Sequence, residues 1–378
     1  MRGLGTLLFI NPLTVAALIA SVAGPAVATH ADIATRVRGE QWHLSFLQAE
    51  KAHQISRGSG IVVALPDTGV DPHPDLRRNL LHGLDLTKQG GDGWTDRDSH
   101  GTSMAGLIAA HGASQSKGAL GIAPDAKILP IRSSLVDGKG DTEELAASVE
   151  WATTHGADII SISAVAGASV RLQRAIQGAL KADIVVLASA GNRPEDAHVG
   201  YPASEPGVIA VAGVDRHGEH AAVSVPGPEV DIAAPAVGVV STSYGGKYSK
   251  GTGTSGATAI VAGAAALIRS KYPDLPAEEV AHRLTATAID KGPPGRDDEY
   301  GYGVIDLVAA LTADVPPLGF ESSAVTPPAS QRALPDDGDD GAAVRGLATL
   351  GVLVAAGGGY LVWRRRRRAG DPPPRVSR

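Results

Sequence analysis

The chain has 378 residues, of which 43% are hydrophobic, so it can build a large folded core and cannot be disordered throughout. Its formal net charge of −6 gives no overall basic field, which argues against a nucleic acid as partner. The absence of cysteine excludes disulfides, Cys-ligated metal centres and a cysteine nucleophile. The 47 glycines and 25 prolines, with 4% aromatic residues, favour a tightly packed α/β protein with many turns.

Residues 1–28 have the features of a secretory signal peptide. Arg2 is followed by an apolar stretch, and Ala26-Val27-Ala28 has the small-x-small form of a signal peptidase site. A retained membrane anchor is the alternative, although Asn11 and Pro12 interrupt the apolar run. Both interpretations predict that the main body is exported.

A second apolar segment, residues 344–364, is predicted to form a transmembrane helix. The chain is uncharged from Gly346 to Trp363, and a helix of that length spans roughly 27 Å, enough to cross a bilayer. The arginines 364–368 could on their own form a nuclear-localisation or nucleic-acid patch, but beside an apolar span they indicate a stop-transfer signal and a cytoplasmic tail, residues 365–378. The prediction is a single-pass protein of the cell membrane whose main body is extracellular.

A proline-rich acidic segment, residues 316–343, separates the main body from this predicted helix. Its prolines and the acidic run from Asp336 to Asp340 bury too little apolar surface for folding, so an extended tether is expected. The folded domain is then residues 60–315. The preceding residues 29–59 are expected to form an N-terminal extension on that domain, because they are too few for a separate folding pro-domain.

The main body alternates between apolar runs and helical stretches. Continuous apolar runs indicate strands buried on both faces, and helices are expected between them at 102–111, 142–155 and 170–181. This order predicts an α/β fold with a doubly wound, mostly parallel sheet, helices on both faces, and functional groups at the carboxyl ends of the strands. The five predicted strands are 60–65, 126–131, 157–163, 184–189 and 207–212.

Four polar residues stand where such a sheet would place functional groups. Asp67 ends the first strand, although on its own an Asp-Thr-Gly turn is the commoner explanation for such a residue. His100 lies where a polar turn enters a small-residue helix, and it could be a turn residue. Ser255 precedes an almost wholly apolar helix, where it is either a simple N-cap or a hydroxyl delivered to the sheet edge. Asn192, just past a strand, is either a turn residue or an amide donor.

Together these four residues supply every part of an acyl-transfer site. A serine hydroxyl needs a base at neutral pH, and His100 can serve as that base for Ser255. Asp67 would fix the tautomer of the imidazole and stabilise its cation. Asn192 and the backbone N–H of Ser255 are candidate donors to the oxyanion.

The order of three short motifs resembles that of the subtilisin-like serine proteases. The motifs are Asp67-Thr68-Gly69, His100-Gly101-Thr102 and Gly253-Thr254-Ser255, and the resemblance covers residues 40–310. It implies a subtilisin-like fold and a serine endopeptidase that acts on proteins or peptides through an acyl-enzyme. In the strand resembling the family's substrate-binding edge, Val165 replaces a customary glycine, which would restrict access to the pocket. The expected substrate-binding residues are Ser161, Ser163, Ala164 and Gly191.

The layout of signal, catalytic domain, tether and C-terminal anchor is most similar to that of the mycosins, the membrane-anchored subtilases of type VII secretion. Type VII secretion components are therefore the expected partners beside the substrates. The alternative function is a subtilase-like scaffold that stabilises a secretion complex. No cofactor and no metal site is expected, because the acidic residues Asp92, Asp96 and Asp98 suggest a solvated loop.

Overall fold

The computed structural model describes residues 30–319, apart from 88–89, 115, 134 and 137–138. The predicted signal peptide, transmembrane helix and tail, and the tether beyond residue 319, lie outside the described residues. Within the described part of the chain, no helix is both long and apolar enough to cross a membrane.

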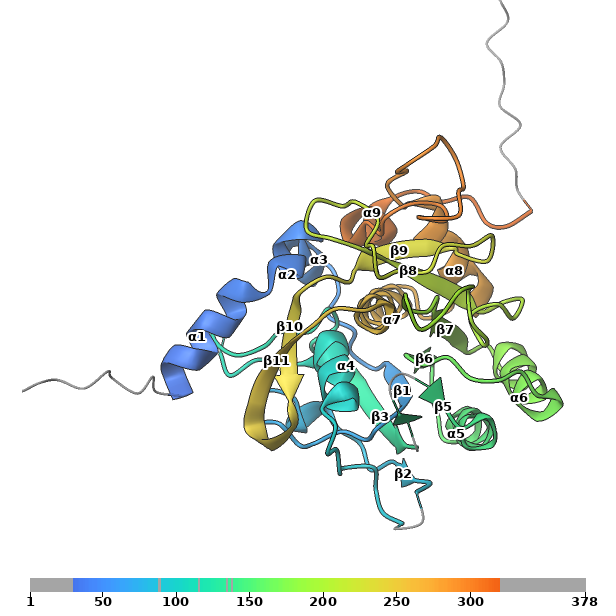
Figure 1. Ribbon diagram of the computed structural model, residues 1–378. Coiled ribbons are helices and arrows are strands. Elements are labelled where there is room, and N and C mark those ends of the chain that lie inside the picture. The colour runs from blue at the N-terminus through green and yellow to red at the C-terminus, as the bar shows by residue number, and fades with distance from the viewer. Residues whose placement is uncertain (1–29, 88–89, 115, 134, 137–138, 320–378) are drawn as a thin grey trace, which may run out of the picture. The chain divides into compact units, whose positions relative to one another are not determined.

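A seven-stranded parallel sheet lies at the centre of the described fold, in the order β2-β3-β1-β6-β7-β8-β9 (Figure 1). The five predicted apolar runs fall on β1, β3, β6, β7 and β8, which confirms the α/β fold and its parallel sheet. The edge strands β2 and β9 were not among the predicted strands, although β9 is apolar and buried. The bounds are β1 Val62–Asp67, β2 Leu84–Asp85, β3 Lys127–Arg132, β6 Ile159–Ile162, β7 Val185–Ser189, β8 Ile209–Val214 and β9 Ile232–Pro235.

Helices cover both faces of the sheet because successive side chains of a buried strand point to opposite faces. On β1, for example, Val63 and Leu65 join one apolar cluster and Ala64 joins another. The first cluster includes α4 His100–Ala109, α7 Thr254–Lys271, α8 Ala277–Ala286 and α9 Leu307–Thr312. The second includes α5 Thr142–Thr154 and α6 Val170–Lys181.

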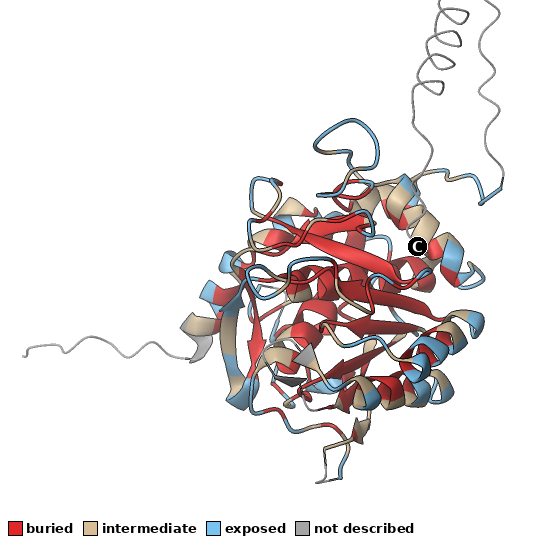
Figure 2. Ribbon diagram, turned by 45° about the vertical axis from the view of Figure 1, so that its right-hand side comes forward, coloured by how far each residue is buried: buried red, intermediate tan, exposed pale blue. Residues whose placement is uncertain are grey.

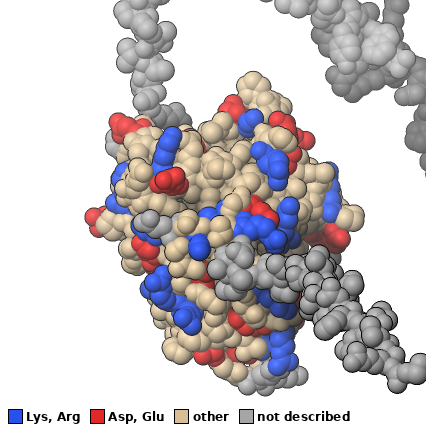
Figure 3. Space-filling view, turned by 90° about the vertical axis from the view of Figure 1, so that its left-hand side faces the viewer, with Lys and Arg blue, Asp and Glu red and all other residues tan. Residues whose placement is uncertain are grey.

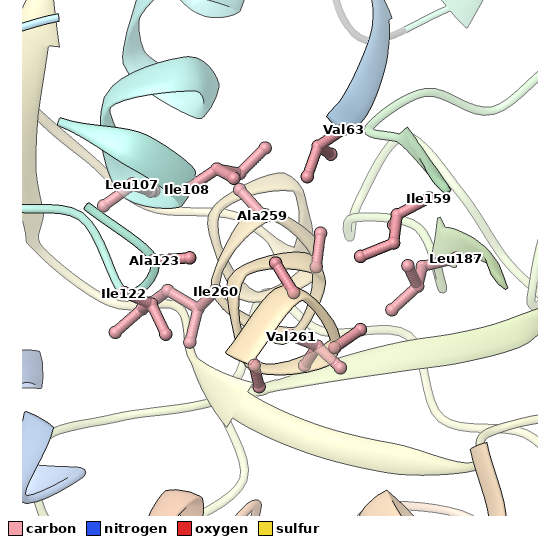
Figure 4. Close-up of a cluster of buried hydrophobic side chains, with 14 of the residues drawn as sticks. Val63, Leu107, Ile108, Ile122, Ala123, Ile159, Leu187, Ala259, Ile260 and Val261 are labelled. Atoms are coloured by element: carbon pink, nitrogen blue, oxygen red, sulfur yellow. The ribbon is translucent and has the colours of Figure 1, made fainter. Parts of the chain in front are cut away.

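Helix α7 is the central helix of the first face and is buried along nearly its whole length (Figure 2). Its alanines and glycines let α4 and the strands pack closely around it, as Figure 4 shows for Leu107 and Ile108 on one side and Ile159 and Leu187 on the other. A helix this apolar is stable only inside a core. Its N-terminus is thereby fixed at the carboxyl edge of the sheet.

The N-terminal extension packs against the main body through α1 His30–Glu40, α2 Trp42–Phe46 and α3 Ala49–His53. The buried amide of Gln41 donates to the carbonyls of Leu120 (3.0 Å) and Val240 (3.2 Å) and accepts from the N–H of Leu120 (2.9 Å). Two distant segments of the domain therefore hold this extension. Two hairpins complete the fold: β4 Leu135–Val136 with β5 Lys139–Gly140, and β10 Val239–Ser243 with β11 Lys247–Gly251.

The face shown in Figure 3 carries basic and acidic side chains interspersed among uncharged residues. Charges of one sign do not gather on the described part of this face. It therefore lacks the kind of basic stripe that follows a nucleic-acid backbone.

Candidate active site

Three elements bring the predicted catalytic side chains to one edge of the sheet. Asp67 ends β1, His100 begins α4, and Ser255 is the second residue of α7. His100 and Ser255 line a common cavity of about 740 Å³, together with Ser163 and Asn192. The parallel sheet explains this convergence, since the carboxyl ends of its strands share one edge.

The hydrogen bond between His100 and Asp67 orients the imidazole. Nδ1 of His100 lies 2.7 Å from Oδ1 of Asp67, a carboxylate with no exposed surface. Because an ionised carboxylate only accepts hydrogen bonds, Nδ1 carries the proton and Nε2 is left as the basic nitrogen. Burial disfavours the imidazolium, but the charge and hydrogen bond of Asp67 outweigh it, so the pKa of His100 is raised above its ordinary value of 6.5.

Gly101 allows the turn carrying His100 to approach the end of β1. A Cβ at Gly101 would lie 2.1 Å from the carbonyl oxygen of Gly69, so no larger residue fits there. The N–H of Gly101 donates to Oγ1 of Thr68 at 3.0 Å. The short contact between Asp67 and His100 depends on this glycine.

Asp96 organises the turn before His100, and the expectation of a solvated acidic loop is wrong for this residue. Its side chain is buried and accepts hydrogen bonds from Oγ1 of Thr68 (3.0 Å), from the N–H groups of Asp98 and Ser99, and from the N–H and hydroxyl of Thr102. These bonds fix the start of α4, which begins at His100 and not at residue 102 as predicted. In the sequence, the one sign of this role of Asp96 is its position four residues before His100.

Ser255 and Ser163 form a reciprocal pair of hydrogen bonds. The hydroxyl of Ser255 donates to the carbonyl of Ser163, and the hydroxyl of Ser163 donates to the carbonyl of Ser255, each at 3.2 Å. The end of β6 is thereby fastened to the first turn of α7. The structure thus brings one predicted substrate-binding residue directly against the predicted nucleophile.

The side chain of Asn192 has a defined orientation. Its Oδ1 accepts hydrogen bonds from the N–H of Thr254 at 2.9 Å and from the hydroxyl of Thr254 at 3.2 Å. Since a backbone N–H can only donate, the bonded atom must be the amide oxygen, and Nδ2 is the end that remains as donor. Asn192 lines the cavity beside Ser255, so it can offer a donor to a developing oxyanion.

The other predicted substrate-binding residues lie at different depths. Ser161 is fully buried within β6 and does not line the cavity, so the structure places it outside the cleft. The side chain of Ala164 is buried as well, and the carbonyl of Gly191 lies 3.2 Å from Oγ1 of Thr254, where it shares the single hydroxyl proton with Oδ1 of Asn192. Ser161 lies within β6, whereas Ser163 follows the carboxyl end of the strand, and this position explains why Ser163 lines the cavity and Ser161 does not.

Val165 occupies space beside the segment that follows Asn192. It lines the cavity, and its Cγ1 lies 2.5 Å from where a Cβ of Gly200 would stand. Its carbonyl accepts a hydrogen bond from the N–H of Gly140 at 3.1 Å. The branched side chain therefore lies at this side of the cleft, and its effect on access to the pocket stays a prediction.

Within the described residues, no group of three or more His, Asp or Glu side chains is arranged to hold a metal ion. The side chains at the site carry hydroxyl, imidazole and carboxylate groups, the kinds of group that proteins use for proton transfer and acyl transfer.

Comparison with known proteins decides the family. A sequence model described as the Subtilase family (Peptidase S8) matches residues 58–303. The chain belongs to the subtilase family. The thermostable alkaline protease of Halalkalibacterium halodurans is 38% identical over 267 residues, which cover 70% of this chain and 71% of that protein. This subtilase is accordingly a subtilisin-like serine protease.

Solved structures similar to this subtilase include two mycosins. MycP1 with its N-terminal propeptide removed superposes with a TM-score of 0.65 at 31% identity, covering 73% of this chain and 98% of that one. MycP3, described as a protease from the type VII (ESX-3) secretion system, gives 0.63 at 34% identity and covers 72% and 88%. The subtilisin-like fold predicted from the motifs is thereby confirmed for the described domain.

Proposed function

We propose that this subtilase is a membrane-anchored, extracytoplasmic endopeptidase that cleaves extended segments of exported proteins with Asp67, His100 and Ser255. The observation that carries the proposal is the 2.7 Å contact between Asp67 and His100 at a cavity that also contains Ser255. Such a contact supplies the base that a serine nucleophile requires.

The reaction begins when the hydroxyl of Ser255 breaks its hydrogen bond to the carbonyl of Ser163 and donates instead to Nε2 of His100. His100 takes the hydroxyl proton as Ser255 attacks the peptide carbonyl, and Asp67 stabilises the imidazolium. The protonated His100 then donates to the leaving amine, which departs and leaves an acyl-enzyme on Ser255. Water, deprotonated by His100, hydrolyses this ester and restores the site.

Replacing Asn192 with alanine is expected to lower kcat by about 10²–10³-fold with little change in KM. The amide faces negative charge that exists only in the transition state, so its loss leaves ground-state binding intact. Steady-state kinetics on one peptide measure both constants. A raised KM with unchanged kcat would assign Asn192 to substrate binding instead. Gln173→Ala, on the exposed surface of α6, is the control and should leave both constants unchanged. Asn79→Ala would not serve, because the buried amide of Asn79 supports the fold.

Truncation after Asp314 is expected to release a soluble enzyme with full peptidase activity. The last helix of the catalytic domain, α9, ends at Thr312, and the anchor is proposed to lie at residues 344–364. Fractionation of cells expressing both forms measures the effect: the full chain should sediment with membranes and the truncated chain should not. Sedimentation of both forms would contradict the proposed anchor.

A role in type VII secretion is supported by the mycosin neighbours and by the layout of signal, tether and anchor. The alternative, a scaffold that stabilises a secretion complex, predicts that Ser255→Ala restores secretion in a deletion strain as well as the wild type. The proposed peptidase predicts that the same variant leaves an exported protein uncleaved. Mass spectrometry of the secreted proteins separates the two functions.

A further inference from the structure

Ser99, the residue before His100, has a backbone conformation that ordinarily belongs to glycine. Its φ is 90° and its ψ is −14°, near the values that glycine adopts in tight turns. A residue with a Cβ is disfavoured at such a φ, because the Cβ crowds the neighbouring carbonyl. The other described non-glycine residues with positive φ, Gln48 and Asp183, do not line the active-site cavity, whereas Ser99 does. The strain therefore lies directly beside the proposed catalytic base.

The conformation of Ser99 determines where the imidazole of His100 lies. Because the peptide unit between the two residues is rigid, a relaxation of Ser99 to negative φ would rotate this unit and carry His100 with it. Asp67 could not follow, because it ends β1, has no exposed surface, and accepts a hydrogen bond on Oδ1 from the N–H of Thr68 at 2.7 Å. The 2.7 Å contact between Asp67 and His100 thus requires that Ser99 keep its positive φ.

The backbone hydrogen bonds of Ser99 do not offset this strain. Its N–H donates to Oδ1 of Asp96 at 3.0 Å, and its carbonyl accepts from the N–H of Ser103 at 2.9 Å. A glycine at this position would make the same two bonds, so they stabilise the turn without compensating for the Cβ. A serine before a helix usually caps it with its hydroxyl, but the side chain of Ser99 makes no capping hydrogen bond. Any compensation must therefore come from another contact of this side chain.

Strand β10 supplies that contact. The hydroxyl of Ser243, a residue that is 6% exposed, donates a hydrogen bond to Oγ of Ser99 at 3.0 Å. β10 runs beside α4 (Figure 1), and the two residues before Ser243 donate their hydroxyls to carbonyls of α4, each at 2.7 Å. Gly106 of α4 permits this close packing, since a Cβ there would lie 2.1 Å from Oγ1 of Thr242. Ser243 is therefore held in place by a strand that is itself fastened to the helix.

We propose that Ser243 is a positioning residue for the catalytic base: its hydrogen bond to Ser99 offsets the strain at that residue and keeps His100 against Asp67. Ser243 does not line the cavity, so it acts through Ser99 and not on the substrate. This inference rests on the proposed role of His100 as the base. A glycine in place of Ser99 would carry no such strain and would make the hydroxyl of Ser243 dispensable.

Two substitutions of Ser99 in the full-length protein test the strain. Ser99→Ala and Ser99→Gly remove the same hydroxyl, but only alanine retains the Cβ that disfavours the positive φ. Ser99→Ala is expected to lower kcat by about three- to tenfold, the effect of losing one neutral hydrogen bond, with little change in KM. Ser99→Gly should keep the kcat of the wild type. No loss in Ser99→Ala, or equal losses in the two variants, would overturn the inference.

Ser243→Ala tests the partner residue, and Ser99→Gly should rescue it. Ser243→Ala is expected to lose as much kcat as Ser99→Ala, and the loss should vanish when Ser99→Gly is added. Ser241→Ala is the matched control, because it removes a hydroxyl of the same strand that holds the carbonyl of Ser103 and not Ser99. Adding Ser99→Gly to this control should leave its kcat unchanged. Rescue of both variants, or of neither, would be evidence against a positioning role for Ser243.

The pH profile of kcat/KM separates a displaced base from a general loss of stability. Burial lowers the pKa of His100, while Asp67, Asp98 and Asp96 raise it above its ordinary value, and every variant retains these carboxylates. A weaker contact with Asp67 lowers this pKa, so the acid limb of the profile should move to lower pH in Ser243→Ala and return with Ser99→Gly. An acid limb at the wild-type pH in Ser243→Ala would contradict the proposed action on His100.

Reaction with a fluorophosphonate distinguishes this inference from the proposed function on which it rests. If Ser255 of the wild-type protein does not react, the catalytic roles fail and the positioning role of Ser243 fails with them. If Ser255 reacts, and the Ser243→Ala variant reacts as fast as the wild type, Ser243 has no positioning role and the catalytic proposal stands. The expected result is reaction of both proteins, with the variant about three- to tenfold slower.

Discussion

Ser255→Ala is expected to reduce kcat by about 10⁶-fold, the loss that subtilisin, a member of the same family, shows without its nucleophile. The hydroxyl is proposed to form the acyl-enzyme, and no neighbouring group can replace it. Its removal adds no strain, because alanine fits the first turn of a helix and only the hydrogen bond to Ser163 is lost. Turnover of a peptide by the purified variant measures the effect.

Ser270→Ala is the matched control for this experiment. It removes a hydroxyl from the opposite end of α7, where Ser270 is bonded to the carbonyl of Ser59 outside the cavity. Full activity is expected in this variant. Peptidase activity in Ser255→Ala close to that of the control would show that another residue is the nucleophile.

Asp67→Asn is expected to reduce kcat by about 10⁴-fold, because an amide at this position no longer holds the reactive tautomer of the imidazole. The effect should be smaller than that of Ser255→Ala, since Asp67 orients and stabilises His100 without forming a bond to the substrate. A variant with wild-type kcat would remove Asp67 from the mechanism.

The pH profile of kcat/KM provides a second readout of Asp67. His100 acts as a base only when neutral, and its pKa is raised, so activity should be lost as the pH falls through a value above the ordinary 6.5. Asp67→Asn removes the charge that favours the imidazolium, which lowers this pKa and moves the acid limb of the profile to lower pH. Asp98→Asn, an exposed carboxylate that also favours the imidazolium, is the control and should shift the limb less.

The fold was predictable because its strands are continuous apolar runs. Residues 184–188, at and just before β7, alternate between the two apolar clusters, so both faces of this strand had to be apolar. The catalytic candidates were predictable for a related reason: Asp67 follows one such strand, and Ser255 begins a helix too apolar to lie anywhere except the core. The order of these elements along the chain and the burial of their apolar residues together bring Asp67 and Ser255 to the same edge of the sheet.

Other features depend on contacts between distant segments, which no local pattern shows. Asp96 resembles a surface turn residue in sequence, yet Thr68 and Thr102 surround its carboxylate and bury it. Ser161 and Ser163 look alike in sequence, but Ser161 lies within β6 and Ser163 just past its carboxyl end, so only Ser163 reaches Ser255.

The most direct test of the central claim is reaction with a fluorophosphonate, which requires an activated serine. The purified full-length protein should gain one adduct, located on Ser255 by peptide mass spectrometry, at a rate that decreases as the pH falls through the pKa of His100. Asp67→Asn should react slowly and Ser255→Ala not at all. No adduct on the wild-type protein, or an adduct on a serine outside the cavity, would contradict the assignment of Asp67, His100 and Ser255 as its catalytic residues.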